Sequence, residues 1–222
     1  ALGAALYADR LHFKNPDRAF PDHPFWGPKL DAAELARLAR EDELPVDALE
    51  DDALIATAVD DLAADRIVAW MEGALELGPR ALGHRSILAA PQSAAMKDRL
   101  NREIKYREEF RPFAPVVPAE LAGEYFELPD GGLRLARFMS GVFKVRPAWR
   151  DRLAAVTHVD GTARVQALEK QMAPRLHTLL LAYGQRTGLP VLLNTSLNLA
   201  GEPIVNRAAE GYSTFRRSGI DV

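Results

Sequence analysis

The chain has 222 residues, which is material for one sizeable domain, or for one domain with a small appendage. Its hydrophobic fraction of 48% and charged fraction of 27% are ordinary for a soluble globular protein. A net charge of −3 excludes a general basic surface for duplex nucleic acid, so any polyanion site must be local. The absence of cysteine excludes disulfides, thiolate metal sites and a cysteine nucleophile. No apolar run approaches the ~20 residues of a membrane span, and no signal peptide is visible.

The first stretch of the chain is predicted to be a linker. Residues 1–30 carry four prolines, and proline fixes φ and removes a backbone donor, so extended or turning chain is expected there. The chain opens without an initiator methionine, and we expect it to be part of a longer protein. We therefore interpret residues 1–30 as an inter-domain linker with the end of a preceding domain, and residues 31–222 as the domain itself.

Two helices are predicted next. Residues 30–40 form a short one, for which Asp31 is the candidate N-terminal cap. Residues 47–65 form a longer one, in which Leu54, Ile55, Ala58 and Leu62 share a face.

Short apolar strands alternate with further helices in the middle of the chain. Residues 67–71 and 86–90 are predicted strands, and residues 92–104 a helix that delivers Lys105 near its C-terminal end. Residues 113–117 are extended, and the prolines in and around them predict an edge or irregular strand.

The last third of the chain continues this alternation. Residues 133–145 are expected to contain one or two strands around Phe138 and Phe143. A helix over 174–186 begins at Pro174, a strand over 191–193 ends in a loop at 194–196, and a last helix capped by Asn206 runs to about 217. Short strands alternating with helices predict a mixed α/β domain.

Basic side chains gather in two short segments rich in glycine and proline. Arg80 and Arg85 lie in a loop with three glycines, at 73, 78 and 83, and glycine permits close approach of a backbone to a ligand. Lys105 and Arg111 follow, the latter between two phenylalanines and two prolines. Arginine matches phosphate or carboxylate with a two-pronged fork, so a pocket for a polyanion is predicted. Solvated arginines in a surface turn and a lysine that satisfies helix carbonyls remain the plain alternatives.

The remaining candidates are weaker. His158 and Asp160 could act together as a general base or as two metal ligands. The five histidines show no metal-ligand spacing, so no metal site is predicted. Ser196 lacks the frame of a serine nucleophile and is better suited as a hydroxyl ligand to phosphate. Neither the phosphate-loop pattern nor the dinucleotide fingerprint is present.

Four longer motifs resemble those of a known family. They are GPRALGHRSIL at 78–88, FRPFAP at 110–115, THVDGTARVQ at 157–166 and LNTSLNLAGEPIV at 193–205. In this order they resemble the C-terminal, YrdC-like domain of O-carbamoyltransferases of the NodU/CmcH type. The resemblance covers roughly residues 66–222, and it implies a twisted mixed sheet with flanking helices around an open cleft.

The resemblance also implies a reaction and its site. The domain would bind ATP, with Mg²⁺ on the nucleotide, and carbamoyl phosphate, and would form carbamoyl adenylate. An N-terminal actin/sugar-kinase-like domain of the same protein would then pass the carbamoyl group to a hydroxyl of an acceptor, and we expect a cytoplasmic enzyme without nucleic-acid or membrane partners. By position, the catalytic residues are expected to be Arg80, Lys105 and Arg111, and the substrate-binding residues Arg85, Arg164, Asn194 and Ser196.

Some positions depart from the family pattern. Ala74 stands where the family commonly has arginine, and Leu77 and Leu197 stand where it has aromatic residues. These departures concern fine substrate geometry more than the fold. Two alternatives remain open: a YrdC-type enzyme that makes threonylcarbamoyl adenylate, and a nucleotide-binding module without catalysis.

Overall fold

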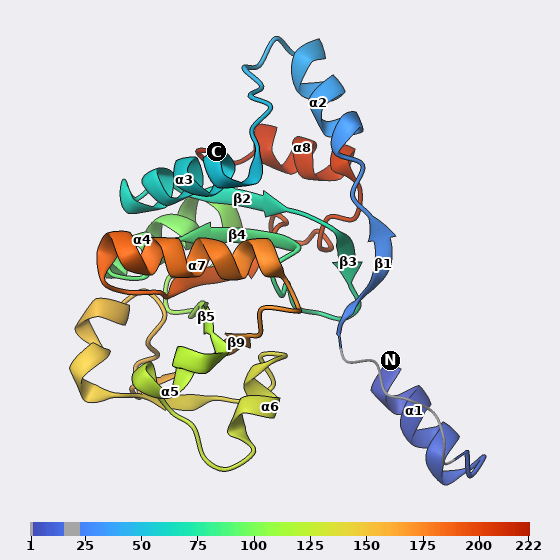
Figure 1. Cartoon of the computed structure of the whole chain (residues 1–222), viewed down its shortest axis with the longest axis vertical. Coiled ribbons are helices and arrows are strands. Elements are labelled where there is room, and N and C mark those ends of the chain that lie inside the picture. Colours follow the sequence, from blue (N-terminus) through green and yellow to red (C-terminus); the bar gives the residue numbers. More distant parts are fainter. Residues whose placement is uncertain (1, 16–22) are drawn as a thin grey trace.

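The computed structural model describes residues 2–15 and 23–222 of the chain. Figure 1 shows a twisted sheet with helices on both faces and a smaller unit of short strands below it. The helices are α1 (Leu2–Leu11), α2 (Ala32–Glu41), α3 (Asp51–Ala63), α4 (Ala94–Leu100), α5 (Ala122–Tyr125), α6 (Gly132–Ala136), α7 (Pro174–Thr187) and α8 (Ala208–Arg216). The strands are β1 (Phe25–Lys29), β2 (Val68–Met71), β3 (Ala74–Glu76), β4 (Arg85–Ala89), β5 (Ala114–Pro118), β6 (Phe126–Glu127), β7 (Phe143–Val145), β8 (Thr162–Ala163), β9 (Gln166–Leu168) and β10 (Leu192–Ser196).

The main sheet has five strands in the order β2-β4-β10-β5-β9. Its first three pairings are antiparallel and the last, β5 with β9, is parallel. The sheet is therefore mixed, as the family resemblance implied. β6, β7 and β8 form a separate antiparallel sheet, and β1 pairs with β3.

The core lies on both faces of the main sheet because adjacent strand residues point to opposite sides. Val68, Leu88 and Leu192 pack with the apolar faces of α3 and α7. Their neighbours Ile87 and Leu193 pack on the other side, with α4 and the small sheet. Both faces are covered, which explains why these strands read as continuous apolar runs and not as alternating ones.

Local sequence signals account for several helix ends. The Asp31 side chain accepts hydrogen bonds from the backbone amides of Ala33 and Glu34, at 3.0 and 3.1 Å, and caps α2 as predicted. α7 begins at Pro174 and ends at Gly188, which has a left-handed conformation that suits glycine. The predicted helix over 92–104 is present as α4 followed by a π-helix, Asn101–Lys105, with Lys105 at its end.

The first stretch of the chain differs from the prediction. Leu2–Leu11 is helical where extended chain was expected, because the prolines of this stretch all follow residue 15 and leave the first ten residues free to form a helix. Pro16 and Pro21 lie outside the described residues. β1 follows, and its pairing with β3 lays part of the expected linker against the domain.

Strand β5 was predicted to be an edge or irregular strand, and the edge position was wrong because β5 lies inside the sheet. Its prolines are tolerated because each lies at a position where β5 pairs with only one of its two neighbouring strands. Pro115 pairs with Leu193 of β10, whereas the pairing with β9 begins one residue later, at Val116. Pro118 pairs with Leu168 of β9, beyond the end of the pairing with β10.

Three smaller predictions were also wrong. Phe138 follows helix α6 instead of lying in a strand, although Phe143 does begin β7. The segment 194–196 belongs to β10, where pairing with β4 continues through it. Asn206 does not cap α8 through its side chain; the Glu210 carboxylate instead accepts hydrogen bonds from the backbone amides of Asn206 and Arg207, at 2.7 and 3.3 Å.

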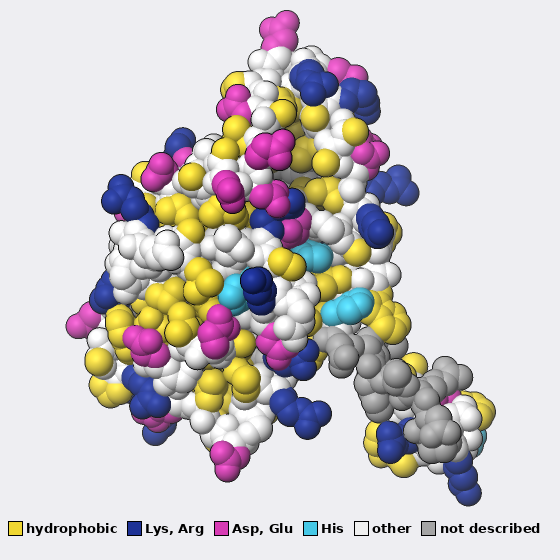
Figure 2. Space-filling view, viewed as in Figure 1, with side chains coloured by type: hydrophobic (Ala, Val, Ile, Leu, Met, Phe, Trp, Pro, Cys, Tyr) yellow, Lys and Arg dark blue, Asp and Glu magenta, His cyan; other side chains and the backbone are white. Residues whose placement is uncertain are grey.

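Charged side chains of both signs are interspersed over the visible face in Figure 2, without a continuous basic surface. No helix in the described part of the chain is long and apolar enough to cross a membrane.

Candidate functional site: an arginine-lined cavity

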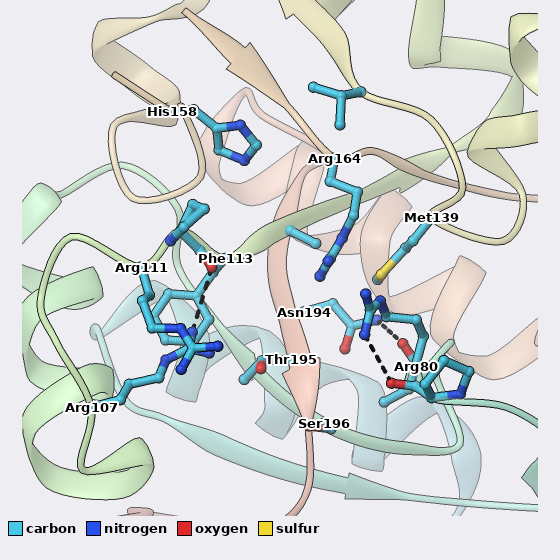
Figure 3. A pocket seen from close by; sticks show the side chains of 15 residues that line it. Arg80, Arg107, Arg111, Phe113, Met139, His158, Arg164, Asn194, Thr195 and Ser196 are labelled. Carbon is cyan, nitrogen blue, oxygen red and sulfur yellow. Dashed lines mark hydrogen bonds between the residues drawn. The ribbon is translucent and has the colours of Figure 1, made fainter. Parts of the chain in front are cut away.

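A cavity of about 380 Å³ lies beside the exposed end of β10, within the size range of small-ligand sites. Six separate segments build its wall, and Figure 3 shows their side chains pointing toward a common space. The lining residues are Pro79, Arg80, Ala81, Arg107, Arg111, Pro112, Phe113, Ala114, Met139, Val142, His158, Arg164, Asn194, Thr195 and Ser196.

Four arginines dominate the charge of this cavity: Arg80, Arg107, Arg111 and Arg164. None of the lining residues is Asp or Glu. Burial, followed by repulsion from Arg111 and Arg164, lowers the pKa of Arg107. Burial and the charge of Arg80 lower the pKa of Arg164 in the same way. The guanidinium groups thus repel one another, and an anion between them would relieve that repulsion.

The available partners of these arginines within the protein are few. Arg111 approaches Glu108 at 3.8 Å, and both side chains are more than half exposed, so this pair is weak. The Nε atom of Arg164 is buried and has no hydrogen-bond partner among the described residues. A buried donor without a partner usually indicates a missing ligand or water.

His158 is held in one orientation by a short chain of hydrogen bonds. The Thr162 hydroxyl donates to the Asp160 carboxylate at 2.6 Å, so it can only accept from the His158 ring at Nδ1, 3.0 Å away. This arrangement leaves Nε2 as the acceptor nitrogen of the neutral ring. Burial lowers the pKa of His158, with Asp160 opposing and Arg164 reinforcing the shift. A neutral imidazole at the wall of a cationic cavity can accept a proton from a bound water.

Lys105 lies in an adjoining hollow instead of in the cavity itself. That hollow shares Arg107, Arg111, Thr195 and Ser196 with the cavity. The Lys105 ammonium donates to the backbone oxygen of Ser196 and to the backbone and side-chain oxygens of Asn198, the last two at 3.0 and 2.8 Å. Its three donors therefore hold the chain that follows β10. Burial, with repulsion from Arg107, lowers the pKa of Lys105 to about 7.

Arg85 does not line the cavity, contrary to the prediction. Its side chain is fully buried and donates to the backbone oxygens of Glu72, His84 and Asn206, at 2.6, 2.9 and 3.3 Å. It ties the segment after β2 and the start of β4 to the segment before α8. A buried arginine with this set of carbonyl acceptors supports the fold, and the sequence motif alone could not separate it from its neighbour Arg80.

Two supporting residues were missed from the sequence. The Glu76 carboxylate accepts hydrogen bonds from the backbone amides of Leu82, His84 and Arg85, at 2.8, 2.7 and 3.2 Å, and so shapes the loop that carries Arg80. Gln166 bridges the same loop to Asn194. In the sequence, Glu76 is a single carboxylate just before a glycine-rich loop and cannot be told apart from an ordinary strand residue. Its role follows only from the structure, in which the loop folds back onto it.

Most of the predicted site residues do meet. Arg80, Arg111, Arg164, Asn194 and Ser196 line one cavity, although they come from separate motifs. Arg107, Met139 and Thr195 line it too and were not predicted. Within the described part of the chain, no group of three or more His, Asp or Glu could hold a metal ion.

The fold and the site together define a class: a mixed α/β domain of the YrdC-like type with a cationic ligand cavity. Two solved structures support the fold. Full-length HypF in its phosphate- and nucleotide-bound form matches 78% of this chain and 21% of its own, with a TM-score of 0.50 and 16% identity. HypF of T. kodakarensis matches 73% of this chain and 19% of its own, with a TM-score of 0.51 and 14% identity.

The chain belongs to the family described as carbamoyltransferase C-terminus, which matches residues 59–222. It is 44% identical to nodulation protein NolO of Bradyrhizobium diazoefficiens, over the whole of this chain and 40% of that protein. It is 46% identical to the 3'-hydroxymethylcephem-O-carbamoyltransferase of Amycolatopsis lactamdurans, over 67% of this chain and 27% of that protein. The predicted family is thereby confirmed, and the chain spans two fifths or less of the length of these curated relatives.

Proposed function

We propose that this domain binds ATP and carbamoyl phosphate in the arginine-lined cavity and forms carbamoyl adenylate. One observation carries the proposal: four arginines line a cavity whose other lining residues include no carboxylate. Such a cavity suits a ligand with several negative charges. Relatives named as O-carbamoyltransferases support a carbamoyl donor as one of the ligands.

Written in balance, ATP, carbamoyl phosphate and one water give carbamoyl adenylate, pyrophosphate and phosphate. Negative charge moves onto both leaving groups. Fixed guanidinium groups that already surround the cavity stabilise this charge without reorganising. We assign this role to Arg80, Arg107, Arg111 and Arg164, and we assign acceptance of a proton from the water to His158.

Lys105 contributes indirectly in this scheme. Its ammonium holds the Ser196 and Asn198 oxygens, and this keeps the end of β10 in place beside the cavity. The Ser196 hydroxyl donates to the Asn198 side chain at 2.7 Å, which leaves its oxygen free to accept and not to donate. Direct contact of Lys105 with a phosphate would require that it give up at least one of these acceptors.

Magnesium would enter with the nucleotide. The lining residues offer it no carboxylate, so the oxygen ligands would come from the ATP phosphates and water. As the resemblance implies, we assign the transfer of the carbamoyl group to an acceptor hydroxyl to an N-terminal domain of the actin/sugar-kinase type. The curated relatives are more than twice as long as this chain, which leaves room for such a domain.

Pyrophosphate release from ATP tests the proposal. The protein that contains this chain is assayed with carbamoyl phosphate, with threonine and bicarbonate, and with no second substrate. Release that depends on carbamoyl phosphate supports the proposal. Release that depends on threonine would instead identify a threonylcarbamoyl-adenylate synthase. ATP binding without release under any of the three conditions would identify a nucleotide-binding module.

A further inference from the structure

One buried acceptor in the cavity wall has no partner within the described residues. The carboxamide of Asn194 lies on β10 in the cavity wall, and the residue is 1% exposed. Its Oδ1 atom is buried and has no hydrogen-bond partner in the part of the chain that the structure describes. Figure 3 shows it beside the ends of Arg80 and Arg164.

The orientation of this amide follows from its neighbours. The Asn194 Nδ2 atom donates to the backbone oxygen of Ala81 at 3.2 Å and to Gln166 Oε1 at 2.6 Å. The Gln166 Nε2 atom in turn donates to the backbone oxygen of Leu82 at 2.8 Å, which fixes Gln166 Oε1 as the acceptor. A reversed Asn194 amide would bring its oxygen against two other oxygens. The network therefore fixes Oδ1 as the remaining atom of a cavity-lining residue, and as an acceptor only.

A buried acceptor that is oriented and unpaired indicates a donor on the ligand. The phosphate oxygens of a polyanion only accept, and they suit the arginines. A donor on the same ligand would lie close to its phosphate, because Asn194 shares the cavity with Arg80 and Arg164. The amino group of carbamoyl phosphate meets this requirement, since it is bonded to the carbon that carries the phosphate oxygen. The adenine amino group is also a donor, but a ribose separates it from the phosphates.

We infer that Asn194 Oδ1 accepts a hydrogen bond from the amino group of carbamoyl phosphate, and that this contact makes Asn194 a specificity-determining residue. The inference rests on the proposed function and deepens it. Acetyl phosphate has nearly the same shape but carries a methyl group in place of the amino group. In the acetyl phosphate complex Asn194 Oδ1 stays buried and unpaired, so the site rejects that ligand.

The test compares the two acyl phosphates in the wild-type protein and in Asn194→Ala. The quantity is the ratio of kcat/KM for carbamoyl phosphate to kcat/KM for acetyl phosphate, from pyrophosphate release. We expect Asn194→Ala to lower this ratio about ten- to a hundredfold, the range for one buried acceptor left unpaired. Asn15→Ala, the same substitution at an exposed asparagine outside the cavity, is the matched control and should keep the wild-type ratio. An unchanged ratio in Asn194→Ala would overturn the inference.

A second arm identifies the donor. ATP is compared with purine riboside triphosphate, which lacks the 6-amino group of adenine. If Asn194→Ala changes the preference between these nucleotides and leaves the preference between the acyl phosphates unchanged, the donor is adenine and the inference is wrong. If Asn194→Ala unfolds, Asn194→Ser serves instead, since it keeps a polar side chain at this position and also removes Oδ1.

Direct binding separates this inference from the proposed function. Calorimetry measures the affinity of the wild-type protein and of Asn194→Ala for carbamoyl phosphate and for acetyl phosphate, without turnover. Preference for carbamoyl phosphate that Asn194→Ala abolishes supports the contact, even if no adenylate forms and the proposed reaction fails. Equal affinity of the wild-type protein for both compounds would refute it, whatever the activity.

Discussion

Arg111 carries a charge at the mouth of the cavity, where its partner in the protein is weak. Its approach to Glu108 at 3.8 Å joins two side chains that are 53% and 62% exposed, and such pairs add little to stability. We therefore expect Arg111→Ala to lower carbamoyl-phosphate-dependent pyrophosphate release about a hundredfold, the typical cost of one preorganised charged donor. Arg111→Lys should restore only part of the rate, because a point charge replaces a fork.

A thermal melt of the same samples completes this comparison. The melting temperature of Arg111→Ala should stay close to that of the wild type. A large fall in melting temperature with normal activity per folded molecule would assign Arg111 a structural role instead.

Lys105 gives the chain a pH-dependent stability. Folding lowers the pKa of Lys105 from the ordinary value of 10.5 to about 7, so between these values the unfolded chain binds more protons. The free energy of unfolding then rises with pH, by up to about 1.4 kcal/mol per pH unit. Below pH 7 both states hold the proton and the full penalty of the buried ammonium remains.

Replacement of Lys105 by methionine removes this dependence. From pH 7 to pH 9 the wild type should gain about 2 kcal/mol of unfolding free energy relative to Lys105→Met, measured by urea denaturation. Lys144→Met, at an exposed position, should follow the wild type across the same range. Parallel curves for the wild type and Lys105→Met would show that Lys105 keeps an ordinary pKa.

Among the elements, the loop that carries Arg80 and Gly83 packs on helix α7. Gly83 has a φ of +116°, which suits glycine, and an added Cβ would lie 2.6 Å from Leu176 Cδ2. Gly83→Ala should therefore destabilise the chain by about 1–3 kcal/mol. Gly123→Ala, in helix α5 with open space around it, should stabilise it by about 0.5–1 kcal/mol. Equal stability of the two variants would contradict this account of the loop.

Elements with strong local signals were predictable from the sequence. Asp31 before α2 and Pro174 with Gly188 around α7 act within one turn of the helix, so the sequence carries their effect directly. The interior position of β5 was not predictable, because the tolerance of its prolines depends on the registers of two strands distant in sequence. The predicted strand for β10 was too short for the same reason. Its polar end is recognised as strand only from its pairing with β4.

The motifs predicted well which residues form the site, but they did not predict the role of each residue. Arg80 and Arg85 stand five residues apart in one motif, yet Arg80 lines the cavity and Arg85 is buried among backbone carbonyls. Strand β4 begins at Arg85 and turns its side chain inward, a direction that sequence spacing does not reveal. Asn194 was predicted to line the site, but its free oxygen follows only from the Gln166 bridge.

At the scale of the whole molecule, a chain of net charge −3 concentrates four arginines in one cavity. The arginines come from three connecting segments: Arg80 from between β3 and β4, Arg107 and Arg111 from the segment before β5, and Arg164 from between β8 and β9. Because separate parts of the fold hold these segments, the cavity is preorganised for an anion at the expense of mutual repulsion.

In the proposed reaction, this cavity joins the carbamoyl group of carbamoyl phosphate to the AMP part of ATP. Exchange of labelled pyrophosphate into ATP measures it most directly, because exchange requires reversible formation of an adenylate in the same site. We predict exchange by the wild-type protein that depends on carbamoyl phosphate, and a loss of at least about a hundredfold in Arg164→Met, which keeps the bulk of the side chain and removes its charge. Exchange that proceeds without carbamoyl phosphate, or that is unaffected in a folded Arg164→Met variant, would contradict the claim.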